Sequence, residues 1–194
     1  PPGRVPALDV GSALVAAGLK ALETTPLADL SLRQIARDVG VSATAVYRHF
    51  PDKAAMWAAV FDWVQTELGQ VVGAAFAAGG EPLAILERVF LAHVGFIASH
   101  PGVPRILFHE LQRPADSEFH ERVRRMVGAY RQRLCALLAL AKEGGHLPAR
   151  LDEEAVAVLF IGTVQGLVVQ STLFRGEAGM KSAARRIFPL LLDG

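Results

Sequence analysis

The sequence between residues 31 and 53, SLRQIARDVGVSATAVYRHFPDK, ends one short amphipathic pattern at Gly40 and starts another at once. Before the break, apolar residues fall at i, i+3, i+4 and i+7, which predicts one buried stripe of a helix. Gly40 follows the last of them, where glycine adopts the left-handed conformation that ends many helices. The stretch therefore predicts two helices joined by a tight turn. The apolar stripe of the first helix is Leu32, Ile35, Ala36 and Val39.

Both predicted helices carry start or stop signals. Ser31 is the expected N-cap of the first, and Gln34 three residues later completes the pattern of a capping box. Ser42 is the expected N-cap of the second. Pro51 disfavours a helical conformation in the residue before it and so ends that helix. Two short helices joined by a turn that contains glycine form a helix-turn-helix.

The outward side of the second helix carries groups that suit contact with DNA. Ala43 and Thr44 are small, so the start of the helix can approach another surface closely. Hydroxyls and cations hydrogen-bond phosphate oxygens, and Arg33 can reach a guanine edge or a phosphate. A face that meets only water is the alternative for any single residue, but the whole set on this spacing favours DNA. The expected contact residues are Ser31, Arg33, Ser42, Ala43, Thr44, Tyr47, Arg48, His49 and Lys53.

These residues resemble the DNA-binding segment of the TetR (tetracycline-repressor-like) family of bacterial transcription regulators. The run Val-Tyr-Arg-His-Phe at 46–50, followed by Asp52-Lys53, is the most specific part of the match. The motif covers the first quarter to third of the chain, and the rest resembles the family in length and helix order. The resemblance implies an all-α fold, with a three-helix DNA-binding head followed by a helical ligand-binding and dimerisation domain.

The rest of the chain also reads as helical, because no alternation typical of a strand occurs. We expect a DNA-binding domain at 1–53, a connecting helix and hinge at 54–80, and an effector-binding and dimerisation domain at 81–194. The first helix, from Asp9 to Glu23, has Val10, Leu14, Ala17 and Ala21 as its expected buried face. Asp52 is the expected N-cap of a fourth helix, whose apolar positions are Met56, Trp57, Val60, Phe61 and Val64. The later helices are expected at about 82–99, 103–112, 117–143, 155–174 and 178–188. Asp152 is the expected N-cap of the helix at 155–174.

Composition says more about the cellular compartment of the protein than about its function. The 194 residues have a formal net charge of +1, so the DNA hypothesis depends on where the charges lie. A single cysteine, Cys135, excludes an internal disulfide and fits a reducing cytoplasm. The opening stretch has no basic leader before an apolar run, so we expect no signal peptide. It begins with Pro1 instead of methionine, so we expect that some leading residues are missing.

The segment 155–174 contains twenty residues without a charge. By length it is a candidate to span a membrane, but its polar residues, such as Gln170, and the lack of an aromatic belt argue against that. The alternative is a helix that is apolar all round because a second subunit covers part of it. In the TetR family, the last two helices form the four-helix bundle of the dimer. We therefore expect a homodimer and no membrane. The expected interface residues are Leu159, Gly162, Gly166 and Val169.

The helix at 82–99 places His93 on its apolar stripe. Such a histidine is a core residue with one hydrogen-bond partner, a ligand contact or a metal ligand, and the sequence leaves these alternatives open. An apolar, aromatic interior with a few polar groups suits a small and largely apolar effector, and the resemblance implies an effector site in this domain. The expected ligand-binding residues are Phe61, Phe90, His93, Phe96, His100, Met126, Tyr130, Phe160 and Gln165.

No motif of a known catalytic class occurs: there is no G-x-S-x-G, no H-E-x-x-H and no glycine-rich phosphate loop. We therefore expect no enzyme activity, no catalytic or metal site and no cofactor. The expected function is a sequence-specific transcription regulator, a homodimer on palindromic double-stranded operator DNA. We expect a repressor that a small effector releases. The alternative is a DNA-binding dimer whose C-terminal domain binds a protein partner.

Overall fold

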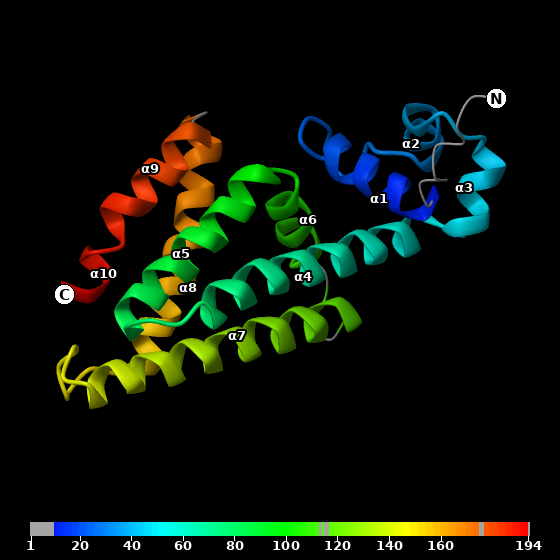
Figure 1. The fold of residues 1–194 in the computed structure, drawn as a ribbon. Helices are drawn as coiled ribbons and strands as arrows, with labels where there is room; N and C mark the ends of the chain where they lie inside the picture. The colour runs from blue at the N-terminus through cyan, green and yellow to red at the C-terminus, as the bar shows by residue number, and fades with distance from the viewer. Residues whose placement is uncertain (1–9, 113, 115–116, 175–176, 194) are drawn as a thin grey trace, which may run out of the picture. The chain divides into compact units, whose positions relative to one another are not determined.

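The structure is a computed structural model that describes residues 10–112, 114, 117–174 and 177–193; Asp9, the expected first residue of the first helix, lies outside them. All regular secondary structure in these ranges is helical, which confirms the all-α fold (Figure 1). The helices are α1 (Val10–Ala21), α2 (Leu32–Val39), α3 (Ala43–His49), α4 (Lys53–Ala77), α5 (Pro82–Ser99), α6 (Val103–Glu110), α7 (Glu118–Glu143), α8 (Glu153–Phe174), α9 (Glu177–Ile187) and α10 (Leu190–Asp193).

Internal contacts divide the chain into two compact units. The head unit comprises Pro1–Glu67 and His100–Arg113, and the body unit comprises Leu68–Ser99 and Pro114–Gly194. The first boundary falls inside α4, and α6 belongs to the same unit as α1, α2 and α3. This division differs from the expected one, which assigned the whole of 81–194 to a single domain.

The helices α1, α2 and α3 of the head unit pack against one another, and the predicted caps of α2 and α3 are confirmed. The Ser31 hydroxyl accepts a hydrogen bond from the Gln34 backbone N–H at 3.2 Å, and the Ser42 hydroxyl accepts one from Ala45 at 3.1 Å. Gly40 ends α2 with φ of +78°, the left-handed conformation that the sequence predicted. The turn geometry of the helix-turn-helix therefore follows from local chemistry.

The buried face of α1 differs from the predicted one. Leu14 is fully buried as expected, but the other three predicted positions are only half-buried. Gly18 lies on the true face, because a Cβ built there would stand 2.6 Å from Cε of Met56 in α4. A glycine adds nothing to a hydrophobic pattern, so this close approach of two helices was not predictable. The buried residues of α1 are Leu14, Val15, Gly18 and Leu19.

Helix α4 begins where predicted, with the Asp52 carboxylate accepting a hydrogen bond from the Ala55 backbone N–H at 2.7 Å. Its apolar stripe continues past the unit boundary, since Val72 and Ala75 are buried as well. One helix thus supplies core residues to both units. The predicted core positions of its first half, all buried, are Met56, Trp57, Val60, Phe61 and Val64.

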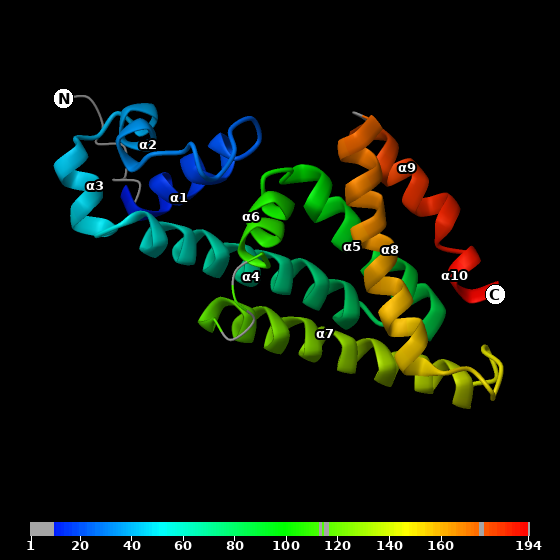
Figure 2. The same ribbon diagram turned by 180° about the vertical axis from the view of Figure 1, so that it is seen from behind.

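In the body unit, α5 packs against α7, α8 and α9, and α8 packs against α7 and α9 (Figures 1 and 2). The Asp152 carboxylate caps α8 by accepting from the Ala155 backbone N–H at 3.1 Å, as the sequence predicted. The Lys142 ammonium near the end of α7 lies 2.7 Å from the Glu153 carboxylate. The largest fully buried side chains of this unit are Leu86, Val89, Phe90, Val94, Leu134 and Leu138.

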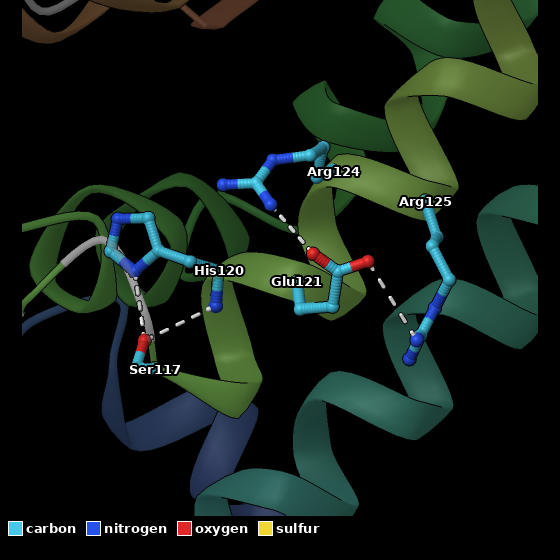
Figure 3. A network of polar contacts seen from close by, with 5 residues as sticks. All are labelled: Ser117, His120, Glu121, Arg124 and Arg125. Carbon is cyan, nitrogen blue, oxygen red and sulfur yellow. Dashed lines mark hydrogen bonds and ion pairs between the residues drawn. The ribbon is translucent and has the colours of Figure 1, made fainter.

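Helix α7 starts with a local polar network (Figure 3). The Ser117 hydroxyl accepts a hydrogen bond from the His120 backbone N–H at 3.3 Å and lies 2.9 Å from Nδ1 of the same residue. The Glu121 carboxylate lies between two arginines, 2.6 Å from Arg124 and 3.9 Å from Arg125. An acid in the first turn also suits the helix dipole, so these contacts stabilise the start of the helix.

Among the described helices, α5 and α8 are long and apolar enough to cross a membrane by length and composition alone. Seven residues of α5 are buried inside the protein, as in a core helix of a soluble protein. A smaller share of α8 is buried, because apolar residues remain exposed along one of its faces. Burial therefore explains the apolar character of α5, whereas α8 keeps one apolar face exposed within the described part of the chain.

We predict that Gly102→Ala destabilises the head unit. A Cβ at Gly102 would stand 2.7 Å from the Leu19 carbonyl oxygen and 2.9 Å from Cβ of Leu22, at the end of α1. Overpacking of this kind costs about 1–3 kcal/mol, to be measured as the free energy of unfolding in urea by circular dichroism. Gly69→Ala is the control, because no described heavy atom lies within 4 Å of its Cβ position. That change should stabilise the helix by about 0.5–1 kcal/mol. Equal stability of Gly102→Ala and the wild type would contradict the close contact.

Candidate functional site

The candidate nucleic-acid interface is the outward face of α2 and α3. Of the expected contact residues, all but Lys53 are exposed. Thr44 and Tyr47 lie one turn apart on α3, and Tyr47 is 46% exposed although it is aromatic. Within the described part of the chain, Arg33 and Arg48 have no hydrogen bond or ion pair. Two exposed guanidinium groups without partners are thus available to a polyanion.

The two capping serines combine two roles. Each hydroxyl oxygen accepts a backbone hydrogen bond, and each hydroxyl hydrogen remains able to donate. A phosphate oxygen is a suitable acceptor for that hydrogen. Ser31 and Ser42 therefore remain candidate phosphate contacts while they hold the ends of α2 and α3.

Lys53 is less free than the sequence suggested. Its ammonium donates a hydrogen bond to the Ala28 carbonyl oxygen at 2.9 Å, and the side chain is half-buried. This contact joins the start of α4 to the segment between α1 and α2. The ammonium has two further N–H donors, so a phosphate contact by Lys53 stays a prediction beside this structural role.

The expected ligand-binding residues are divided between the two units. Phe61 and His100 belong to the head unit, where the His100 ring meets the edge of Trp63 at 5.3 Å between centroids. Gln165 belongs to the body unit but is exposed on α8. Phe96 is buried and Met126 is half-buried. The remaining four expected residues form one continuous set of ring contacts in the body unit.

We call this set, with its immediate neighbours, the aromatic cluster. Tyr130 lies 5.5 Å from His93 and 6.3 Å from Phe160 between ring centroids, and Phe160 lies 5.1 Å from Phe90. The contacts of Tyr130 and Phe90 with Phe160 are edge-to-face, a favourable geometry for aromatic rings. The cluster consists of Phe76 from α4, Phe90 and His93 from α5, Tyr130 from α7, Phe160 from α8, and Phe188.

One polar contact lies among these rings. The Tyr130 hydroxyl is 3.4 Å from Nδ1 of His93. Desolvation lowers the pKa of His93 from its usual 6.5 to about 4, although part of the side chain remains accessible. Desolvation also raises the pKa of Tyr130, against a smaller opposing effect of Arg133. Both groups are therefore neutral at pH 7.

The sequence patterns missed three residues near this cluster. Phe76 lies in an Ala/Gly-rich stretch that looked like a hinge, yet its ring meets Tyr130 at 6.4 Å. The Arg133 guanidinium lies 4.0 Å above the Phe76 ring centroid, a cation–π contact. Phe188 contacts Phe90 at 5.5 Å from the segment after α9. The three-residue spacing of Tyr130 and Arg133 could have been used to predict that both lie on the same side of one helix. No sequence pattern indicated the contacts between distant segments.

The expected dimer residues share one exposed face of α8. Leu159 is 53% exposed and Val169 is 45% exposed, and both glycines between them are exposed too. Steps of three or four residues place these four positions on the same side of the helix. Val158 and Leu173 add further exposed apolar area to that side. We call this surface the α8 face.

Two family models match the sequence. Residues 14–60 match "Bacterial regulatory proteins, tetR family", and residues 113–187 match "Tetracyclin repressor-like, C-terminal domain". The first match contains α2 and α3, and the second contains the whole of α7, α8 and α9. The chain belongs to the TetR family.

The chain is also similar to individual proteins, in sequence to some and in fold to others. The nucleoid occlusion factor SlmA of Vibrio cholerae is 27% identical over 139 residues, which cover 71% of this chain and 70% of that protein. The fatty acid degradation regulator FadR of Bacillus halodurans has the same fold, with a TM-score of 0.80 at 18% identity over 99% of this chain and 97% of the other. The FadR of Bacillus subtilis, solved in complex with stearoyl-CoA, gives 0.77 at 17% identity over 94% and 98%.

Family membership establishes the general activity. This TetR-family protein is a DNA-binding transcription regulator. Members of the family bind operator DNA, dimerise, are soluble and are typically not enzymes. Desolvation and Glu154 raise the pKa of the Cys135 thiol, so the thiol form predominates at neutral pH.

We predict different effects for the two unpaired arginines of this regulator. Arg33→Ala should relax the preference at one base pair of the operator by about 1–3 kcal/mol, because a base-edge contact is lost. Arg48→Ala should weaken binding to all sequences alike and reduce the slope of log affinity against log salt by about one. Fluorescence anisotropy with operator and single-base variants measures both quantities.

Arg150→Ala, at an exposed arginine between α7 and α8 in the body unit, is the matched control and should leave both quantities unchanged. A uniform loss of affinity for Arg33→Ala, with the base preference intact, would reassign that residue to a phosphate contact.

Proposed function

We propose that this regulator is a cytoplasmic homodimeric repressor that binds a palindromic operator and is released by a small, largely apolar effector. The observation that carries the DNA part is the exposed face of α3, which presents Thr44, Tyr47 and Arg48 beside the free arginine of α2. The nine expected DNA contacts stay part of this proposal. We propose no catalytic residue, metal ion or cofactor.

The effector part of the proposal rests on the aromatic cluster of the body unit. Its rings form a largely buried apolar interior with one polar pair, the composition that small-molecule sites share. The complex of the Bacillus subtilis FadR with stearoyl-CoA supports a largely apolar ligand, because that protein has the same fold. Among the predicted residues, the proposal therefore retains Phe90, His93, Tyr130 and Phe160 as the main contacts.

A second function has its own support. SlmA, one of the relatives by sequence, is named for nucleoid occlusion and not for a response to a ligand. A DNA-binding dimer whose body unit binds a protein partner is therefore the second candidate. The two candidates differ in one measurable property, since only the first requires a small molecule to change DNA affinity.

We predict that Gly166→Leu on the α8 face converts the dimer into monomers. Within the chain, no described heavy atom lies within 4 Å of the Cβ position of Gly166, so a leucine fits the single chain. Between two closely packed copies of α8, the same side chain would separate the helices. Light scattering measures the mass, and Gly69→Leu, at another open glycine, is the control. A dimer of unchanged affinity in Gly166→Leu would move the interface away from α8.

Chain connectivity suggests how an effector reaches the DNA-binding helices. The chain passes between the two units inside α4 after Glu67, between Ser99 and His100, and between residues 113 and 114. Phe76 follows the crossing inside α4, and His93 of α5 precedes the crossing after Ser99, each by no more than a few turns of helix. A ligand that moves either helix therefore acts on elements continuous with the head unit.

The two α3 helices of a dimer must enter successive major grooves about 34–36 Å apart, so a small rotation of each head abolishes the fit. Effector and operator then compete although they occupy different sites. By linkage, each must lower the affinity of the other by the same factor.

We predict this reciprocity for any effector of the wild-type protein. Calorimetry should measure the effector affinity twice, with and without saturating operator, and the operator affinity twice, with and without effector. The ratio of the two effector affinities should equal the ratio of the two operator affinities. A coupling of about 1–3 kcal/mol, or 5–150-fold, is typical. Equal effector affinities in the two titrations would contradict release by an effector and favour the second candidate.

A further inference from the structure

Gln165 lies among exposed apolar residues on the α8 face. Leu159 is 53% exposed and Val169 is 45% exposed, and the two glycines between them are exposed as well. Gln165 is also exposed, and steps of three or four residues place it on the same side of the helix. Within the described part of the chain, its amide has no hydrogen bond. A molecule that covers the α8 face therefore buries an amide that now meets only water.

The hydroxyl groups of α8 are satisfied within the helix itself. The Thr163 hydroxyl donates a hydrogen bond to the Leu159 carbonyl oxygen at 2.8 Å, and the Thr172 hydroxyl donates one to the Val168 carbonyl oxygen at 2.9 Å. These groups can be covered without the loss of a hydrogen bond. A buried amide without a partner, by contrast, lowers stability. The partner that covers the α8 face must therefore satisfy Gln165.

The position of Gln165 along the face suits a two-fold axis. The exposed apolar residues of the face extend from Val158 to Leu173, and the midpoint of that range lies between Gln165 and Gly166. Two antiparallel copies of α8 that cross at this midpoint would cover the whole face. Each residue then meets the one equally far beyond the midpoint in the second copy. The two Gln165 residues are offset by only about 1.5 Å along the helices, so their side chains meet at the axis.

The sizes of the side chains agree with this register. Gly162 falls opposite Val169 of the second copy, and Gly166 falls opposite Gln165 of the second copy. Small residues thus face larger ones, as in a well-packed interior. Within the chain, no described heavy atom lies within 4 Å of the Cβ position of either glycine. Both positions are therefore open to a side chain of the second copy.

The charges of α8 favour antiparallel helices over parallel ones. The first turn of α8 holds two acids, Glu153 and Glu154, and residues 155–174 carry no charge. Parallel helices would bring the acids of both copies together, along with two helix-dipole ends of the same sign. Antiparallel helices keep the acids at opposite ends of the interface.

We infer that α8 pairs with α8 of a second copy in this antiparallel register, and that the two Gln165 amides hydrogen-bond to each other across the two-fold axis. A primary amide can both donate and accept, so two identical side chains satisfy one another. A chain of the same fold with an apolar residue at this position would leave the Gln165 amide buried and unpaired. The amide pair therefore sets the register and selects a second copy of this chain. This inference rests on the homodimer proposed above and specifies its geometry.

Disulfide cross-linking tests the register. The background is Cys135→Ala, which removes the single natural cysteine. An equal mixture of Gly162→Cys and Val169→Cys chains should form a disulfide-linked dimer on oxidation, because these positions face each other. Each variant alone should give little product, since its two thiols are offset by roughly 10 Å along the helices, beyond the reach of a disulfide. Self-cross-linking of Gly162→Cys, or no cross-linked dimer from the mixture, would overturn the register.

Gln165→Glu tests the contact at the axis. At pH 8 two carboxylates would meet there, so the dimer dissociation constant from analytical ultracentrifugation should rise roughly tenfold relative to the wild type. At pH 5 a proton shared by the two carboxyl groups should remove most of this loss. Gln170→Glu is the matched control, because its two copies are offset by roughly 13 Å along the helices, beyond the screening length at physiological salt. An equal pH dependence of the two variants would overturn the amide pair.

Gln165→Leu tests whether the amide selects the register. A leucine needs no hydrogen bond, so the dimer should persist, but several registers become acceptable. Gly162→Cys combined with Gln165→Leu should therefore begin to cross-link with itself. If this combined variant still cross-links only with Val169→Cys chains, the amide does not set the register.

Light scattering of the wild type separates this inference from the proposed function. A wild-type dimer that gives another pattern of cross-links overturns the register and leaves the homodimer in place. A wild-type protein that remains monomeric contradicts the homodimer itself and the inference with it.

Discussion

The unbroken backbone hydrogen bonding of α4 is the constraint on which both units depend. Its 25 residues start at the Asp52 cap, and the boundary between the units falls within them. The apolar stripe of such a helix must serve two cores in turn, so Met56 and Trp57 fill the head and Val72 and Ala75 fill the body. A break in this helix would interrupt the apolar stripe that both cores share and one of the three passages of the chain between the units.

The features that sequence predicted well are those set by neighbouring residues. Ser31, Gly40, Ser42 and Asp152 were correctly identified as helix ends, because a cap needs only a side chain and the backbone three residues away. The half of the capping box that failed is informative. The Gln34 side-chain oxygen accepts a hydrogen bond from the Arg37 guanidinium instead of from the Ser31 backbone N–H, and the Gln34 amide nitrogen donates to Asp38 at 2.9 Å.

The features that sequence did not predict depend on contacts between distant segments. Gly18 and Gly102 matter because another helix comes within van der Waals contact, and a pattern of apolar residues cannot register the absence of a side chain. The same holds for the placement of α6 in the head unit. In the candidate effector site, the histidine and the tyrosine were each predicted as contacts, but their mutual hydrogen bond joins residues 37 positions apart. The exposure of Gln165 shows the reverse error, a polar residue assigned to an interior from its chemistry alone.

The α8 face has a consequence for how the protein responds to its own abundance. Apolar side chains such as Leu159 and Leu173 are costly in water, so in the dimer proposed above a second copy that covers them stabilises the fold by mass action. Folding, assembly and operator occupancy then depend on the same protomer concentration. At low copy number the concentration of competent dimers rises roughly with the square of that concentration. A modest change in synthesis or degradation would therefore switch the target promoter more sharply than a monomeric regulator could.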